Sequence, residues 1–232
     1  MSTESKLGVE FIGTFFLVLT IGFVVLTGTP MGPAAIGAAL MVMVYMGGHV
    51  SGGHYNPAVS LAVLLRGKLQ ARDVVPYMAA QILGAFAAAA VVYLVAGRTF
   101  APTPGENVSV LGALAVEVLY TTALCLVVLH SATAPQTTGN SFYGLAIGFT
   151  VMAGAYAGGP ISGGAFNPAV GIGPIVFSAL AGGSAANLWL YLVGPFIGGG
   201  LAATLYRLQQ PSERTPQEAL DMGTAAPQPL AR

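Results

Sequence analysis

The chain has 232 residues, of which 55% are hydrophobic and only 7% are charged. Soluble domains carry about 25% charged residues, so this composition excludes a soluble enzyme and a disordered chain. The eight basic and eight acidic residues cancel, which leaves no basic surface for the phosphates of a nucleic acid. Three long tracts lack Asp, Glu, Lys and Arg, at 11–65, 74–97 and 118–206. Uncharged tracts of this length predict an integral membrane protein.

Clusters of Pro and Gly divide these tracts into six apolar segments that are long enough to cross a bilayer. The expected spans, in chain order, are 7–27, 34–50, 74–96, 110–130, 142–158 and 187–207. Two further apolar pieces, 56–66 and 167–178, are too short, because ten or eleven residues give about 15 Å of helix against a hydrocarbon core of ~30 Å. The sequence therefore predicts an all-α membrane protein with six transmembrane helices and two half-membrane re-entrant helices.

The chain also contains an internal repeat. Residues 51–60 read SGGHYNPAVS and residues 162–171 read SGGAFNPAVG, with seven of ten positions identical at an offset of 111 residues. Each half holds three spans and one half helix, and because three is odd, the second half must be inverted relative to the first. We expect one transmembrane domain over 1–206, with repeats at about 7–96 and 110–206. A flexible cytoplasmic tail is expected at 207–232.

The basic residues indicate the orientation in the membrane. With the N-terminus inside, seven of the eight Lys and Arg residues face the cytoplasm and only Arg98 lies outside. This bias follows the positive-inside rule. We therefore expect both termini to be cytoplasmic, in a cell membrane of the plasma or inner type.

An Asn-Pro-Ala triplet begins each half helix: Asn56, Pro57 and Ala58 in the first repeat, and Asn167, Pro168 and Ala169 in the second. Asn is a preferred N-cap and Pro suits the first helical position. In inverted halves, the two helix N-termini meet near the membrane midplane. Their positive ends and carboxamides would repel cations and hold a water molecule so that a proton wire is interrupted. One triplet could be an ordinary helix start, but the pair indicates a central constriction.

These features resemble the aquaporin (major intrinsic protein) family over about residues 7–207. The resemblance rests on the paired Ser-Gly-Gly-x-x-Asn-Pro-Ala-Val segments, the Glu of the first and fourth spans, and Gly-Pro-Phe-Ile-Gly-Gly at 194–199. It implies a pore through each subunit of a homotetramer in the lipid bilayer, and a passive channel for water and small neutral solutes. The sequence holds no metal-ligand cluster, nucleophile triad or phosphate-binding loop, so we expect no enzyme activity, cofactor, metal or nucleic-acid partner.

The family's narrow selectivity filter uses four positions, which fall here on Ile36, Ala155, Gly164 and Val170. Strict water channels typically have an aromatic residue, a His, a small residue and an Arg there, so the chain departs at three of the four. Loss of the Arg removes a fixed charge and several donors, and the substitutions add width and apolar wall. We expect water to pass together with glycerol, urea, ammonia, hydrogen peroxide or gases. The opposite expectation is an apolar constriction that dewets and conducts little.

Subfamily signals conflict near the second triplet. Glycerol channels of the family typically carry Asp where this chain has Gly171, whereas Tyr191 stands where water-type members have an aromatic residue.

Four further residues are expected to support the re-entrant loops. Glu10 and Glu117 are the carboxylates within the predicted spans, and an intramembrane acid is a functional candidate. Their repeat-related positions favour hydrogen bonds to loop backbone over a proton relay. His49 and His54 flank the first loop, where packing partners are favoured over a pH gate.

Two other functions share this pattern of helices. Broken helices in inverted repeats also occur in coupled secondary transporters, and a poorly conducting membrane structural protein would have the same spans. The sequence places no charge near the midplane to bind a coupling ion, which favours a channel.

Overall fold

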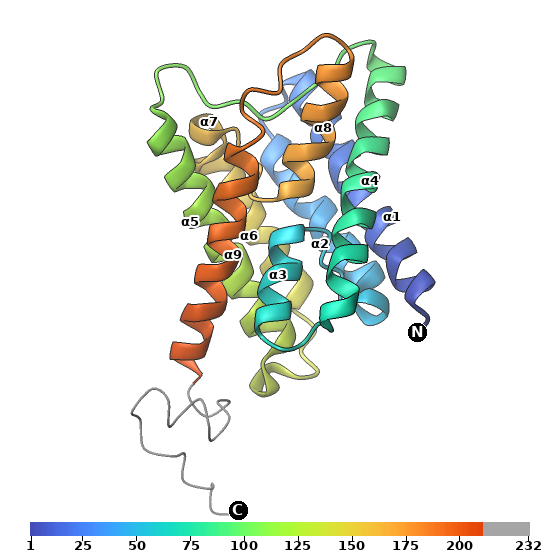
Figure 1. Cartoon of the computed structure of the whole chain (residues 1–232), viewed down its shortest axis with the longest axis vertical. Coiled ribbons are helices and arrows are strands. Elements are labelled where there is room, and N and C mark those ends of the chain that lie inside the picture. The colour runs from blue at the N-terminus through green and yellow to red at the C-terminus, as the bar shows by residue number, and fades with distance from the viewer. Residues whose placement is uncertain (211–232) are drawn as a thin grey trace, which may run out of the picture.

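The computed structural model describes residues 1–210, and over these residues the chain forms helices and connecting loops (Figure 1). The six long helices are α1 (Thr3–Thr27), α2 (Gly32–Ser51), α4 (Ala71–Ala96), α5 (Val110–Val128), α6 (Tyr143–Ala157) and α9 (Leu190–Gln209). The short ones are α3 (Pro57–Leu65), a π-helix η1 (Leu129–Thr133), a 3-10 helix η2 (Pro135–Thr137), α7 (Gly159–Ser162) and α8 (Pro168–Leu180). Residues 211–232, most of the tail expected from the sequence, lie outside the described residues.

The ends of the long helices follow local side-chain chemistry. The Ser2 hydroxyl accepts the backbone N–H of Ser5 and so caps α1, which ends at Gly28 in the left-handed conformation. Ser109 caps α5 through the N–H of Gly112. Caps of this type satisfy backbone groups that have no partner inside the helix.

The six long helices form the membrane bundle that the sequence predicts. By length and composition, α1, α2, α4 and the Val110–Thr133 segment of α5 and η1 qualify as membrane spans. α6 has only 15 residues, but α7 begins just after its C-cap, Gly158. α9 is not among these four helices, because its Gly-Gly-Gly run is one of the features that lower its mean hydropathy. Its 20 residues nonetheless give about 30 Å of helix, which is long enough to cross a bilayer.

The two half helices enter the bundle from opposite ends. α3 has nine residues and α8 has 13, so they measure about 14 Å and about 20 Å. In Figure 1, α3 occupies the lower half of the molecule and α8 the upper half, and their N-terminal ends face each other at mid-height. α1 packs on α4, and α5 packs on α9 as the matching pair of the second repeat. The fold is therefore the inverted repeat expected from the sequence.

The crossing of α2 and α6 requires glycine at two positions. A Cβ atom on Gly37 would lie 2.6 Å from the carbonyl oxygen of Gly148, and one on Gly148 would lie 2.5 Å from the carbonyl oxygen of Gly37. Small residues let helix backbones approach closely inside a membrane.

The Asn-Pro-Ala segments occupy the centre of the protein. Residues 53–60 and 165–171 are buried without interruption. Irregular backbone at membrane depth is tolerated only where protein or water covers it, because lipid offers it no hydrogen bonds. The bundle therefore shields both re-entrant segments from lipid.

Candidate functional site

Asn56 and Asn167 cap the two half helices in the same way. The Oδ1 atom of Asn56 accepts the N–H of Ala58 at 2.8 Å, and that of Asn167 accepts the N–H of Ala169 at 2.9 Å. A proline follows each Asn as the first helical residue, and the two Asn residues have nearly equal φ and ψ angles, −158° and 119° against −160° and 115°. The two repeats thus build one local structure twice.

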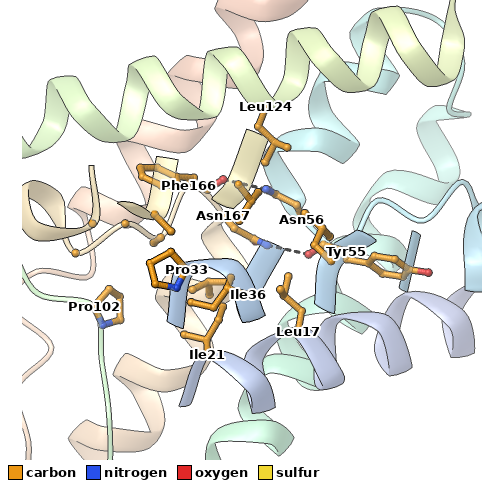
Figure 2. A pocket seen from close by; sticks show the side chains of 18 of the residues that line it. Leu17, Ile21, Pro33, Ile36, Tyr55, Asn56, Pro102, Leu124, Phe166 and Asn167 are labelled. Atoms are coloured by element: carbon orange, nitrogen blue, oxygen red, sulfur yellow. Dashed lines mark hydrogen bonds between the residues drawn. The ribbon is translucent and has the colours of Figure 1, made fainter. Parts of the chain in front are cut away.

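The same two carboxamides tie the two re-entrant segments together. Nδ2 of Asn56 donates to the carbonyl oxygen of Phe166 at 2.9 Å, and Nδ2 of Asn167 donates to that of Tyr55 at 2.9 Å (Figure 2). Each carboxamide has two N–H groups, so one on each Asn is left for a molecule beside it. The structure brings together the tips that the sequence predicted to meet. The reciprocal pairing was not predicted, because no sequence signal specifies which carbonyl each amide reaches.

Tyr55 and Phe166, just before the caps, hold an unusual backbone conformation. Their φ angles are 49° and 48°, in the left-handed region that bulky residues seldom occupy. Strain of this kind costs about 1–3 kcal/mol per residue and persists only where the surroundings enforce it. Here each residue is fixed at both ends, since its carbonyl accepts an Asn N–H and its own N–H donates to a buried glutamate.

Glu10 is fully buried and organises the first re-entrant loop. Four groups donate to its carboxylate: Oγ of Ser51 at 2.6 Å, N of His54 at 3.0 Å, N of Tyr55 at 2.7 Å and Nε2 of Gln81 at 2.8 Å. Two of these donors are backbone N–H groups that lipid could not satisfy. Gln81, in α4, was missed from the sequence because it lies in an otherwise ordinary apolar span.

Glu117 does the same for the second loop with fewer donors. Its carboxylate accepts Oγ of Ser162 at 2.7 Å, N of Ala165 at 3.0 Å and N of Phe166 at 2.7 Å. Ser162 stands in the repeat position of Ser51, and both backbone donors have counterparts in the first loop. This is the geometry of loop support.

The two histidines flanking the first loop lie in different environments. His49 is in the last turn of α2 and is exposed. His54 is only 8% exposed, its Nδ1 lies 3.0 Å from Oγ of Ser60, and its ring centroid lies 5.4 Å from that of Tyr77. The structure therefore places His54 within the loop network and His49 at the helix surface.

A cavity of about 370 Å³ runs beside both Asn residues (Figure 2). All four expected filter residues line it: Ile36, Ala155, Gly164 and Val170. Most of the remaining wall is apolar. The lining side chains that carry a polar group are His54, Tyr55, Asn56, Thr103 and Asn167.

The loop between α4 and α5 also reaches this cavity. Residues 100–103 line the cavity, and the N–H of Gly105 donates to the carbonyl oxygen of Ile161 at 3.0 Å, which holds the loop against α7. Thr103 adds a hydroxyl near the filter. The sequence indicated only a turn-rich break here, because entry into the cavity depends on this contact between distant segments. Among the described residues, no cluster of three His, Cys, Asp or Glu side chains is arranged for a metal ion.

Known proteins with similar sequences and folds form one consistent group. Residues 10–206 match the family described as Major intrinsic protein. The chain is 37% identical over 215 residues to "Probable aquaporin TIP2-2" of Oryza sativa subsp. japonica, covering 85% of this chain and 84% of that protein. It is 36% identical over 214 residues to "Glycerol uptake facilitator protein-like 6" of Lactiplantibacillus plantarum, covering 86% and 95%. The X-ray structure of the aquaglyceroporin from Plasmodium falciparum matches with a TM-score of 0.78 at 25% identity, covering 88% of this chain and 96% of that one.

Proposed function

The chain belongs to the major intrinsic protein family, and from this premise we propose that its pore passes water and larger neutral solutes while excluding ions and protons. Family membership makes it an integral membrane channel for water and small solutes, and not an enzyme. The solute range, the ion exclusion and the roles of individual residues form the proposal.

The solute range is supported by the wall of the cavity at the four filter positions. Ile36 and Val170 present apolar side chains there, whereas Ala155 and Gly164 present a methyl group and no side chain. Gly159 also lines the cavity, and a Cβ atom on it would have no heavy atom within 4 Å. This wall leaves room for a molecule larger than water. It offers an ion few groups to replace its hydration shell, so a charged solute would be desolvated without compensation.

Ion exclusion at the centre is supported by the paired caps. Two helix N-termini, each carrying a partial positive charge, face the same short stretch of the cavity. The free N–H groups of Asn56 and Asn167 are available to one water oxygen. A water molecule whose oxygen accepts both of these bonds does not accept bonds from both neighbouring waters, so proton transfer along the file stops there.

Orientation and assembly complete the proposal. α1 begins and α9 ends at the same end of the molecule (Figure 1), and most of the basic residues belong to that end. We assign this end to the cytoplasm by the positive-inside rule and place the protein in a cell membrane. The homotetramer follows from the family resemblance.

Stopped-flow light scattering on proteoliposomes tests the proposal, with protein-free liposomes as the control. An impermeant solute measures water flux, and reswelling in glycerol, urea or ammonia gradients measures solute flux. We expect the protein to accelerate both water and glycerol or urea. Water flux alone would indicate a strict water channel, and no flux would indicate a dewetted filter. Accumulation driven by sodium or protons would indicate coupled transport, and each of these three results contradicts the proposal.

A further inference from the structure

Two side chains lie between the cavity beside the Asn pair and a second cavity. A second cavity, of about 480 Å³, is lined by residues of α1, α2, α3, α4, α5 and η1 and of the loops on either side of α3, including Lys6, Ser51, Gly52, Lys68, Asp73 and Tyr77. Two residues line both this cavity and the one beside the Asn pair: His54 and Val128. The two cavities therefore adjoin where His54 and Val128 lie, one polar and one apolar.

A chain of hydrogen bonds ends on the His54 ring. Nε2 of Gln81 donates to Oε2 of Glu10 at 2.8 Å and to Oγ of Ser60 at 2.9 Å. Oγ of Ser60 lies 3.0 Å from Nδ1 of His54. All four side chains are buried.

The donors and acceptors along these hydrogen bonds allow the hydrogen positions to be assigned. The Glu10 carboxylate requires the amide nitrogen of Gln81 on its side, because the amide oxygen would meet a second acceptor there. Both amide hydrogens are then used, one on Glu10 and one on the Ser60 oxygen. Among the hydrogen bonds of the described residues, Nδ1 of His54 is the one partner that can accept the Ser60 hydrogen, so we assign Nδ1 as the acceptor.

The ring hydrogen of a neutral His54 then sits on Nε2. A neutral imidazole with Nδ1 as acceptor carries its hydrogen on the other nitrogen. Nε2 lies on the side of Gly52, where a Cβ atom would be 3.0 Å away, and Gly52 lines the second cavity. The N–H group therefore faces the place where the two cavities adjoin.

The second repeat shows that this chain is not needed to hold a re-entrant loop. At the offset of 111 residues, Ala165 replaces His54 and Gly171 replaces Ser60. Glu117 nonetheless binds its loop with one serine and two backbone N–H groups. The side chains of His54, Ser60 and Gln81 therefore come in addition to the contacts that hold the second loop.

We propose that Gln81 and Ser60 are positioning residues that hold His54 neutral, with its Nε2–H presented to the passage between the two cavities. A neutral solute then meets a hydrogen-bond donor, and not a cation, where the two cavities adjoin. The proposal rests on the pore proposed above and continues it past His54 and Val128 into the second cavity.

Five titratable groups of the described residues line the second cavity with His54 or act on its ring. Lys6 and Glu10 lie on α1, Asp73 and Tyr77 on α4, and Lys68 in the loop after α3. The residues that α5 and η1 contribute to the same cavity carry no titratable group. A change in the pH profile that is caused by His54 must therefore be distinguished from the titration of these five groups.

The experiment uses the full chain in proteoliposomes and removes the donor to Nδ1 with Ser60→Ala. Solid-state ¹⁵N NMR of ¹⁵N-histidine-labelled protein reports the tautomer, with the His54 resonances assigned from a His54→Phe sample. Stopped-flow water permeability is measured between about pH 5 and pH 8. Ser178→Ala is the matched control, because it removes a part-buried hydroxyl of α8 that bonds Thr99. Ser60→Thr restores the hydroxyl.

We expect wild type, Ser178→Ala and Ser60→Thr to show the Nε2–H tautomer alone and a flat pH profile. In Ser60→Ala, both tautomers should appear, and permeability should fall about twofold as pH drops through about 6.5, where a free histidine gains its proton.

A single Nε2–H tautomer and a flat profile in Ser60→Ala would overturn the positioning role, as would mixed tautomers in wild type or the same changes in Ser178→Ala. Failure of the pore path gives a different result. His54→Phe, which fills the passage beside Val128, would then leave water permeability unchanged.

Discussion

The side-chain amide of Asn56 donates to the carbonyl oxygen of Phe166 at 2.9 Å, across 110 residues of sequence. Asn167 returns the same bond to Tyr55. The bond joins the two inverted halves at the point where their half helices meet, so neither tip is free to withdraw without losing a partner. The central constriction is thus a joint product of both repeats.

The first prediction concerns charge at this centre. Asn56→Asp replaces the donor to Phe166 with a carboxylate and places a negative charge between two helix N-termini. We expect proton or cation leak to rise about tenfold, which corresponds to a barrier lower by about 1.4 kcal/mol. A pH-sensitive dye inside proteoliposomes under a clamped potential measures the leak. Asn107→Asp, in the exposed outer loop, is the control, and an equal leak in both variants would contradict the role of the Asn pair.

The second prediction concerns the filter. Val170→Arg places a charged, donor-rich side chain in the cavity wall, where Val170 is now 4% exposed. We expect glycerol and urea flux to fall about tenfold or more while water flux is retained, because the guanidinium narrows the pore and binds water. Val170→Thr, of similar size and without charge, should behave like wild type. Unchanged glycerol and urea uptake in Val170→Arg would show that the filter lies elsewhere.

The sequence predicted the helices and half helices well because their signals are local. Asn followed by Pro specifies a helix start through capping and a fixed φ angle, and the apolar tracts specify the spans. Contacts between distant segments left no such signal. The π-helix over Leu129–Thr133 is held by bonds such as Nδ2 of Asn140 to the carbonyl oxygen of Ser131 at 2.7 Å, and the role of Gln81 appears only when α4 packs against Glu10.

The third prediction concerns loop support. Glu117→Ala removes the acceptor for the N–H groups of Ala165 and Phe166. A buried N–H without a partner costs about 1–3 kcal/mol, so the free energy of unfolding should fall by about 2–6 kcal/mol. Thermal unfolding in detergent measures this loss. Glu106→Ala, in the exposed outer loop, should leave the midpoint unchanged, and a matching midpoint for both variants would argue against the support role.

The fourth prediction concerns space beside the second triplet. A Cβ atom on Gly171 would lie 2.5 Å from Cβ of Tyr191. Tyr191 is fully buried, and its hydroxyl donates to the backbone carbonyl oxygen of Ser162 at 2.6 Å. Gly171→Ala should therefore lower stability by about 1–3 kcal/mol through overpacking. Gly159→Ala should not, since no heavy atom lies within 4 Å of its Cβ position. Equal melting temperatures for the two variants would refute this packing.

The most direct test of the account is a chemical block placed in the cavity wall. Ala155→Cys puts a thiol on the filter, whereas the native Cys125 is fully buried and inert toward a polar thiol reagent. Leu111→Cys, at a 75% exposed position of α5, is the labelling control. A charged methanethiosulfonate reagent should reduce water flux through Ala155→Cys to the level of protein-free liposomes and leave wild type and Leu111→Cys unaffected. Complete labelling of Ala155→Cys with undiminished water flux would show that water does not pass between the paired Asn residues and this filter.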